Sequence, residues 1–343
     1  MNTNKPEKPL LDLQNVEKRF ALDQGFLETI KMRGGKLIRE KREVHAVNNV
    51  SLSVERGEAL CVVGESGCGK STVARLIAGL LTPSAGEIHY DGERIDNRSR
   101  HDLLPLRKKM QMIFQNPYAS LNPRMTIQQA LEEPVKYHTP SLTRAEVKDK
   151  VAEVMLSVGV DPSWSARYPH EFSGGQRQRI AIARALTVNP EFIIADEPIS
   201  ALDVSIQAQV LNLMLEAKEQ RGLTYLFITH DLSVVQHFGT RVAVLYLGSV
   251  CELADTATLF ENPKHPYTKA LLSAVPQLKD DGPSHIRLKG EIPTPINLPL
   301  GCPFESRCAY ANVRCETERP AAVQQPDGSL VACHAVEEDR LQD

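Results

Sequence analysis

Long apolar runs are missing from this chain of 343 residues. A helix needs about 18 consecutive apolar residues to cross a bilayer, and no segment approaches that length. Residues 1–6 are polar and lack the apolar stretch of a secretory signal. The sequence therefore predicts a cytoplasmic protein whose association with any membrane depends on a partner.

The chain also lacks a dominant charge. It has 40 Lys and Arg residues and 43 Asp and Glu residues, which gives a net charge of −3. Such a balance provides no global attraction to nucleic acid or to anionic lipid, so we expect no nucleic acid among the partners. The hydrophobic content of 42% is normal for a globular core. The length suits one large domain or two ordinary ones.

Cysteine is scarce, with seven residues, but it is unevenly distributed. Four cysteines fall within the segment 302–333, namely Cys302, Cys308, Cys315 and Cys333. In a reducing cytoplasm such a group indicates metal binding before disulfides. The intervals exceed the about two to four residues that usually separate paired zinc ligands, and they match neither common ferredoxin pattern. Zinc, a [4Fe–4S] cluster and free thiols all remain open on spacing alone. We expect Cys61 and Cys251, in predicted strands, to be packing residues.

A complete phosphate-loop motif, GESGCGKS, occupies residues 64–71. It follows the apolar run 59–63 and precedes a helix that we expect to begin at Lys70 and end near Gly79. Glycines let backbone amides wrap around phosphate oxygens, and the helix N-terminus adds its dipole there. Lys70 should reach the β and γ phosphates, and the Ser71 hydroxyl should ligate Mg²⁺. The predicted ATP-binding residues here are Gly64, Glu65, Ser66, Gly67, Cys68 (a small filler residue), Gly69, Lys70, Ser71 and Thr72.

Two acidic residues, Asp196 and Glu197, end the apolar run 192–196. Ligands gather at the carboxyl ends of strands in open α/β sheets. Asp196 is predicted to hold Mg²⁺, directly or through water. Glu197 points elsewhere because it is the next residue, and this suits a base that polarises the attacking water.

Apolar runs and helical periodicity alternate along most of the chain. Strands are predicted at 11–16, 50–54, 59–63, 192–196, 224–228 and 241–246, and helices at 126–134, 144–158 and 204–219. Thr143 and Glu146 predict a capping box at the start of helix 144–158, and Gly159 is expected to end that helix. Alternating strands and helices predict a parallel sheet covered on both faces, with a helical subdomain in the middle of the chain.

The character of the sequence changes beyond Thr256. Prolines recur over 263–303, and periodicity fades after Ala274. This pattern predicts an appended tail and not a second α/β domain.

Residues 172–176 read FSGGQ and lie between the phosphate loop and Asp196. This order of motifs resembles the ATPase domain of ATP-binding-cassette (ABC) proteins, in which ATP is clamped between two chains. The resemblance implies an α/β fold, that of an ABC ATPase (P-loop NTPase) with a RecA-like core, an antiparallel β subdomain and a helical subdomain at about 116–185. The implied domains are 1–255 for the nucleotide-binding domain and 256–343 for a small C-terminal extension that contains the cysteines.

The resemblance also implies roles for single residues. Gln115, after the apolar run 110–114, resembles the glutamine that touches Mg²⁺ and water and senses the transmembrane partner. His230 resembles the switch histidine that contacts the γ phosphate, and Phe20 resembles the aromatic that stacks on adenine, where tyrosine is more usual. Residues 200–203, ending in Asp203, resemble the loop that joins the two chains.

The signature residues implied by the resemblance are Ser173, Gly174, Gly175 and Gln176. They would open a helix facing the γ phosphate of the opposing chain, so a lone chain holds half of each site and hydrolysis requires a dimer. Phe172 stands in place of the commoner leucine and Ile199 in place of a small residue. Neither change removes a catalytic motif.

The tail indicates which subfamily of ABC ATPases the chain resembles. Residues 259–272, LFENPKHPYTKALL, resemble a stretch typical of dipeptide, oligopeptide and nickel importer ATPases. The four tail cysteines resemble the same subfamily's C-terminal motif, which favours the [4Fe–4S] cluster over zinc, and the chain looks closest to the second ATPase of peptide importers. The implied partners are a sister ATPase, two permease subunits and, through them, an extracytoplasmic peptide-binding protein, at the cytoplasmic face of the inner membrane. Nickel, glutathione or a peptide antibiotic would leave much the same ATPase.

The insert at 21–43 carries six lysines and arginines between Lys31 and Arg42. It is either a solvated loop or a contact with lipid headgroups or the permease. Among rival functions, a soluble ABC ATPase acting on nucleic acid or ribosomes usually has two cassettes or a long coiled-coil insertion, and this chain has neither. An exporter ATPase would not account for the tail cysteines.

Overall fold

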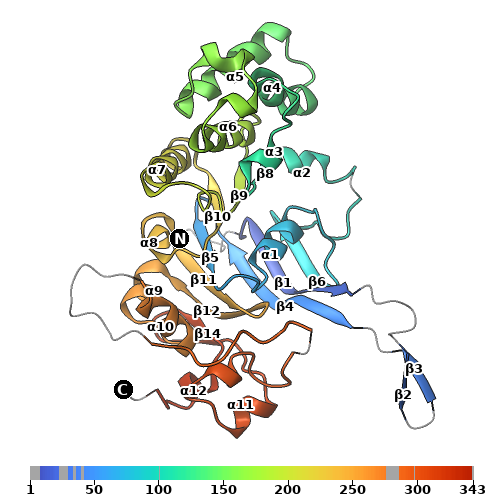
Figure 1. Cartoon of the computed structure of the whole chain (residues 1–343), viewed down its shortest axis with the longest axis vertical. Coiled ribbons are helices and arrows are strands. Elements are labelled where there is room, and N and C mark those ends of the chain that lie inside the picture. Colours follow the sequence, from blue (N-terminus) through green and yellow to red (C-terminus); the bar gives the residue numbers. More distant parts are fainter. Residues whose placement is uncertain are drawn as a thin grey trace, which may run out of the picture.

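The computed structural model describes residues 8–22, 30–33, 36–39, 42–99, 101–275, 286–296 and 298–341. Figure 1 shows an elongated molecule with a group of helices at one end, two sheets in the middle and the C-terminal segment at the other end. None of the helices in these ranges is both long and apolar enough to cross a membrane.

The central sheet has eight strands in the order β13-β14-β12-β11-β5-β10-β9-β8. They are β5 (Ala59–Val63), β8 (Met110–Ile113), β9 (Phe192–Asp196), β10 (Thr224–Ile228), β11 (Arg241–Tyr246), β12 (Ser249–Asp255), β13 (Val323–Gln324) and β14 (Leu330–Val331). From β11 to β8 the strands run parallel, and β12 joins them antiparallel. Every residue of β5, β9 and β10 is buried, as in parallel sheets covered on both faces. The four strands predicted in this region are confirmed.

The second sheet is antiparallel, with the order β4-β1-β6-β7. Its strands are β1 (Leu11–Ala21), β4 (Glu43–Val54), β6 (Ala85–Tyr90) and β7 (Glu93–Arg94). Both strands predicted here exist, but they are longer than expected. Register shifts between Leu13 and Arg19 interrupt the alternation on which the prediction depended.

Helix α1 (Lys70–Ile77) lies between the two sheets. Its buried residues Val73 and Ile77 belong to the same apolar cluster as Val50 of one sheet and Leu60 of the other. The helix ends two residues before Gly79, which takes the left-handed conformation, with φ of 64°. The loop that opens this helix is therefore fixed by two sheets at once.

The helical region comprises α2 (Leu104–Lys109), α3 (Pro117–Ser120), α4 (Ile127–His138), α5 (Arg144–Ser157), η1 (Pro162–Ala166), η2 (Pro169–Glu171) and α6 (Gly174–Leu186). The capping box of α5 is confirmed, because Thr143 and Glu146 exchange hydrogen bonds. The predicted end of α4 at Pro134 is wrong. Burial of Val135 holds the next turn helical, although Pro134 donates no backbone hydrogen bond.

Helices α7 (Val204–Arg221) and α8 (Leu232–Phe238) follow β9 and β10, and both contribute buried residues to the larger apolar core. The later elements are α9 (Thr256–Glu261), α10 (Pro266–Ser273), η3 (Glu305–Arg307), α11 (Val313–Thr317) and α12 (His334–Glu337).

The described part of the tail packs into the same core as the preceding domain. Tyr267, Phe304 and Cys315 belong to one apolar cluster with Val242 and Tyr246 of the central sheet. Strand β14 pairs with β12 and so extends that sheet. The predicted boundary at residue 255 therefore divides two segments that share one core. That these two segments have separate functions stays a prediction.

The insert leaves and rejoins the antiparallel sheet at paired residues, Ala21 and Glu43. Within it, β2 (Ile30–Arg33) and β3 (Lys36–Arg39) form an antiparallel hairpin. Residues 23–29, 34–35 and 40–41 lie outside the described residues. The proposed contact of this insert with lipid or permease stays a prediction.

Candidate nucleotide site

The phosphate loop joins β5 to α1, and two of its glycines are required by close approaches. A Cβ atom at Gly64 would lie 2.2 Å from the carbonyl oxygen of Leu245, and one at Gly69 would lie 2.2 Å from that of Ala46. Both glycines also have positive φ, 149° and 104°. The backbone of strands β11 and β4 therefore leaves room only for glycine at these two positions, and this close packing sets the shape of the loop.

On its other side the loop faces open space. A Cβ atom at Gly67 would meet nothing within 4 Å. A cavity of about 530 Å³ opens there, large enough for a nucleotide's phosphates. It is lined by Val44, Ala46, Ser66, Gly67, Gly69, Lys70, Ser71, Thr72, Gln115, Glu197, His230 and Pro295. Free backbone amides at a helix N-terminus beside an open glycine fit a phosphate group.

Lys70 places a positive charge at the base of this cavity. Its side chain is buried, and Nζ donates to the carbonyl oxygens of Gly64, at 2.7 Å, and Glu65, at 3.0 Å. Both of these partners are neutral carbonyl oxygens, so the positive charge of Lys70 favours an anion in the cavity above it.

Ser71 and Asp196 meet below the loop, where the Ser71 hydroxyl donates to the Asp196 carboxylate at 2.9 Å. Burial raises the pKa of the Asp196 carboxyl; the Ser71 hydrogen bond opposes the rise and the neighbouring Glu197 adds to it. Hydroxyl and carboxylate oxygens are the ligands that Mg²⁺ prefers. The pair therefore fits a Mg²⁺ ion, whose charge would favour the ionised form of Asp196.

The Glu197 carboxylate faces a different set of partners. One oxygen accepts a hydrogen bond from Gln115 at 2.9 Å and lies 3.5 Å from Nδ1 of His230. The backbone of Glu197 has φ of 48°, a left-handed conformation that costs about 1–3 kcal/mol in a non-glycine residue. This turn separates two adjacent carboxylates, so that Asp196 faces Ser71 and Glu197 faces the cavity. The three residues predicted to be catalytic thus lie together.

The signature residues begin helix α6, where Ser173 and Gln176 form a capping box. A Cβ atom at Gly175 would lie 2.4 Å from Cγ2 of Ile206, so the helix packs closely on α7. Asp203 caps α7. None of the four signature residues lines the cavity at the phosphate loop.

Phe20 lies near the site but does not line it. It is 37% exposed and pairs with Val44, which does line the cavity. The amino group of Lys18 lies 5.2 Å from the centre of its ring. Its role as the adenine platform stays a prediction.

Pro295 was not predicted as part of the site. It reaches the cavity from the tail, and its carbonyl oxygen accepts a hydrogen bond from the amide of His45 at 2.8 Å. Its neighbours at 291–299 form no motif, so no sequence signal identified it.

The four tail cysteines lie close to one another. The amide of Cys302 donates to the carbonyl oxygen of Cys315 at 2.8 Å. Burial, together with smaller contributions from the neighbouring Cys333, Cys315 and Cys308, raises the pKa of the Cys302 thiol to about 12. All are free thiols, yet within the described ranges no group of three or more His, Cys, Asp or Glu side chains is arranged to hold a metal ion. The four thiols are therefore neighbours in the structure, but their side chains are not arranged as in an assembled metal centre.

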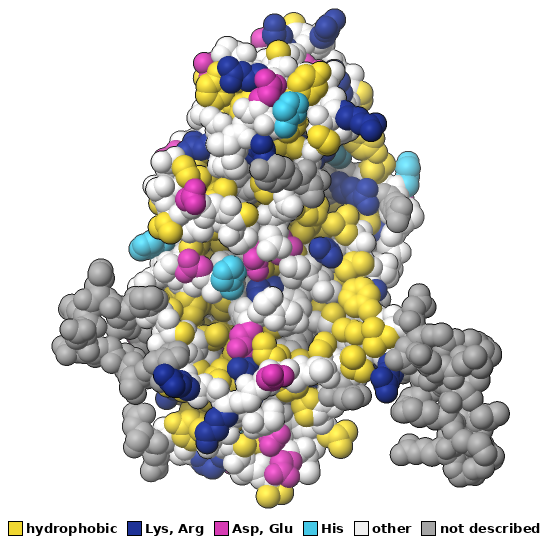
Figure 2. Space-filling model, viewed as in Figure 1, with side chains coloured by type: hydrophobic (Ala, Val, Ile, Leu, Met, Phe, Trp, Pro, Cys, Tyr) yellow, Lys and Arg dark blue, Asp and Glu magenta, His cyan; other side chains and the backbone are white. Residues whose placement is uncertain are grey.

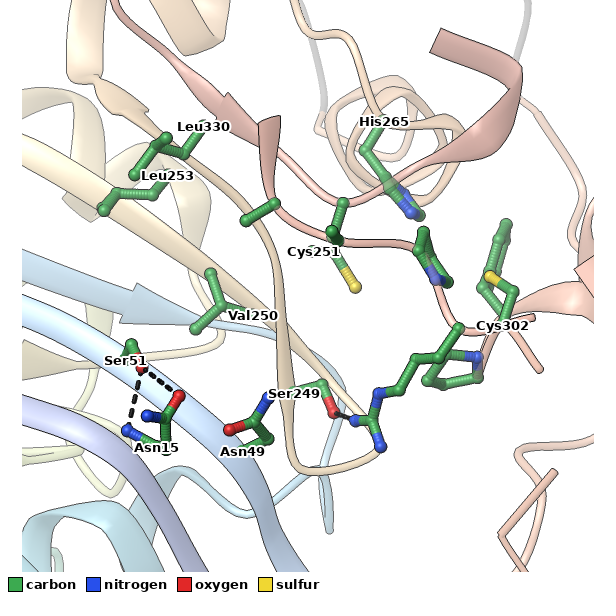
Figure 3. Close-up of a pocket in the computed structure, with 17 residues that line it drawn as sticks. Asn15, Asn49, Ser51, Ser249, Val250, Cys251, Leu253, His265, Cys302 and Leu330 are labelled. Carbon is green, nitrogen blue, oxygen red and sulfur yellow. Dashed lines mark hydrogen bonds between the residues drawn. The ribbon is translucent and has the colours of Figure 1, made fainter. Parts of the chain in front are cut away.

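Cys61 and Cys251 are buried in β5 and β12, which confirms their prediction as packing residues. Cys251 also lines a second cavity, of about 440 Å³, together with Cys302 (Figure 3). This cavity lies between the antiparallel sheet, which contributes Asn15 and Ser51, and the tail.

A phosphate loop at the carboxyl edge of a parallel sheet, with a glutamate held by a glutamine and a histidine, is the site of an ATP-hydrolysing P-loop cassette. The solved structure titled "Dimeric structure of a post-hydrolysis state of the ATP-binding cassette MJ0796 bound to ADP and Pi" superposes with a TM-score of 0.62 at 29% identity, covering 72% of this chain and 98% of that one. A family model described as "ABC transporter" matches residues 47–200. A second, "Oligopeptide/dipeptide transporter, C-terminal region", matches residues 251–315.

Curated relatives match nearly the whole chain. The oligopeptide transport ATP-binding protein AppF of Bacillus subtilis is 49% identical over 96% of this chain and 98% of its own length. The dipeptide transport ATP-binding protein DppF of Escherichia coli is 45% identical over 97% and 96%. The oligopeptide transport ATP-binding protein OppF of Salmonella typhimurium is 50% identical over 91% and 92%. The chain belongs to the family of ATP-binding proteins of oligopeptide and dipeptide ABC transporters.

Proposed function

We propose that this chain is the ATP-hydrolysing subunit that powers import of dipeptides or oligopeptides through a permease heterodimer. It works at the cytoplasmic face of the inner membrane, beside a sister ATPase and below permeases fed by an extracytoplasmic peptide-binding protein. The observation that carries the proposal is the combination of an intact nucleotide cavity with a tail that matches the peptide-transporter family over 251–315.

Each part of the cavity has a task in hydrolysis. The amides of the loop and Lys70 bind the phosphates, and Glu197 accepts a proton from the attacking water. Ser71, Asp196 and Gln115 would hold Mg²⁺. Gln115 and His230 orient the Glu197 carboxylate. Gln115 would also contact Mg²⁺ and the attacking water, and His230 would contact the terminal phosphate. Bound Mg²⁺ would neutralise charge that develops on the phosphate oxygens.

The site is completed by a partner chain. Ser173, Gly174, Gly175 and Gln176 lie outside the cavity of their own chain. The capping box takes up the amides of Ser173 and Gln176, so the amides of Gly174 and Gly175 would be the ones that face nucleotide bound to the sister ATPase. Asp203 lies in the loop between the two chains. Closure of this pair on ATP, and reopening after hydrolysis, would drive alternating access in the permeases.

A groove of about 400 Å³ beside Gln115 suits the permease. Three of its apolar side chains are exposed, Leu80 at 52%, Phe114 at 37% and Tyr137 at 62%. The groove lies between the α1 end of the core and α4, and Phe114 adjoins Gln115 in sequence. An apolar segment of a permease seated here would move with the catalytic glutamine.

Charge argues against the rival that acts on nucleic acid. Figure 2 shows acidic and basic side chains interspersed over the visible face, with no broad basic surface. A phosphate backbone would require a concentration of Lys and Arg.

Uptake of labelled di-, tri- and pentapeptides tests this function in cells that lack the chain. We expect the intact chain to restore uptake, and Tyr137→Glu to restore less than about a tenth of it, because a buried charge disrupts the apolar contact. The matched control is Leu156→Glu, at an apolar residue of α5 that is 63% exposed; it should restore uptake fully. If the intact chain restores uptake of none of the three peptides, the proposed peptide cargo is wrong.

We propose further that the four tail thiols hold a [4Fe–4S] cluster, with zinc as the alternative. Their proximity supports this, although side-chain movement is needed to bring them to ligand distances. A cluster would cross-link four positions of the proline-rich tail and so stabilise its fold.

Metal analysis of anaerobically purified protein tests the cluster. We expect about four iron atoms and four labile sulfides per chain, and loss of both in Cys315→Ser. Cys61→Ala, in the core of the sheet, serves as the control and should keep them. Stoichiometric zinc without iron or sulfide refutes the cluster.

A further inference from the structure

One residue of the phosphate loop, Glu65, is held by the tail. The two terminal nitrogens of Arg307 donate to the two carboxylate oxygens of Glu65, at 2.7 and 3.1 Å. The Arg307 side chain is only 7% exposed, and that of Glu65 is 26% exposed. A two-point, largely buried contact of this kind is directional and strong.

The backbone of the same residue is held as well. The amide of Glu65 donates to the hydroxyl oxygen of Tyr267 at 2.9 Å. Tyr267 is fully buried, and burial raises the pKa of its hydroxyl, so the group stays neutral. Both the side chain and the main chain of Glu65 are therefore fixed by residues beyond 255.

The two tail residues are themselves held by packing and hydrogen bonds. Phe304 packs against the rings of Tyr246 and Tyr267, with centroids 5.2 and 5.4 Å away. Arg307 follows in the short η3 turn and also donates to the Tyr246 hydroxyl at 3.4 Å. Because Tyr246 belongs to the central sheet, the turn is anchored to the sheet that supports the loop.

Glu65 links this anchor to the phosphate-binding lysine, because its carbonyl oxygen accepts a hydrogen bond from Lys70 at 3.0 Å. We infer that Arg307 and Tyr267 are positioning residues that hold the phosphate loop in its nucleotide-binding shape through Glu65. The inference rests on the proposed ATPase function and extends it, because it makes the tail a part of nucleotide binding.

Binding of a fluorescent ADP analogue and the KM for ATP test the inference on the full chain. We expect Arg307→Gln to weaken binding and raise KM on the order of tenfold, within the usual range of coupling between sites. The kcat should change less than about twofold, since Glu197 is untouched. Arg307→Lys should recover part of the loss, because lysine keeps the charge but not the two-point geometry. Tyr267→Phe should show a smaller loss of the same kind.

Two further variants separate positioning from stability. Arg314→Gln removes ion pairs to Glu318, Glu337 and Glu338 elsewhere in the tail and should leave nucleotide affinity unchanged. In a Glu65→Gln background, Arg307→Gln should add little to the loss, because the contact is already broken. If Arg307→Gln lowers only the melting temperature and binds nucleotide like the intact chain, the inference is wrong. If the intact chain itself binds no nucleotide, the proposed function fails instead.

Discussion

Replacement of Glu197 by glutamine is expected to abolish ATP turnover while ATP still binds. The substitution preserves the shape and the contact with Gln115 but removes the group that accepts the proton of the attacking water. Loss of a general base costs about 10²–10⁴-fold in rate. Because Lys70 and the loop are unaffected, ATP should remain bound and hold the paired ATPases closed.

Phosphate release and gel filtration with ATP measure this effect on the chain with its sister ATPase. Glu191→Gln is the matched control, since Glu191 immediately precedes β9 and forms surface ion pairs with Arg56 and Lys109. It should hydrolyse ATP at the normal rate and show no trapped dimer. Undiminished hydrolysis by Glu197→Gln would refute the assignment of the base.

The second large effect is expected at Gly69, where alanine should nearly eliminate nucleotide binding. The new Cβ would lie 2.2 Å from the carbonyl oxygen of Ala46, a backbone atom that cannot rotate away, and φ is 104°. Backbone strain and overpacking each cost about 1–3 kcal/mol. A loop distorted by about 3 kcal/mol loses on the order of a hundredfold in affinity.

Gly57→Ala provides the comparison for this variant. Gly57 also has positive φ, 74°, but a Cβ there would meet nothing within 4 Å. It should lower the melting temperature slightly through strain and leave nucleotide binding intact. Equal binding by Gly69→Ala, measured with the same fluorescent nucleotide, would show that β4 does not shape the loop.

Local signals predicted the local structure well. The capping box of Thr143 and Glu146 depends on residues three apart, so the sequence contains its whole cause. Strands 192–196 and 224–228 pair with distant segments, but their continuous apolar runs already marked them as buried strands. Predictions failed where distant packing decided the outcome. Helix α4 passes Pro134 because of buried contacts, and strand β1 passes residue 16 because β4 and β6 continue beside it.

The residues of the tail show the same contrast between what local sequence predicts and what distant packing decides. Its four cysteines are visible as a group in the sequence, but spacing alone does not place their sulfur atoms relative to one another. The contact of Arg307 with Glu65 joins residues that no sequence pattern connects. Such a pair appears only when the tail packs against the central sheet.

By itself, the sequence determined the nucleotide chemistry of this protein, because the phosphate loop, the Asp196-Glu197 pair and the signature are each contiguous motifs with their own backbone geometry. The tertiary structure alone decided how these motifs meet. Gln115, Glu197 and His230 converge because β8, β9 and β10 are parallel neighbours whose carboxyl ends share one edge of the sheet. The loop keeps its shape because Leu245, Ala46 and Arg307 press on it or hold it from three other parts of the chain.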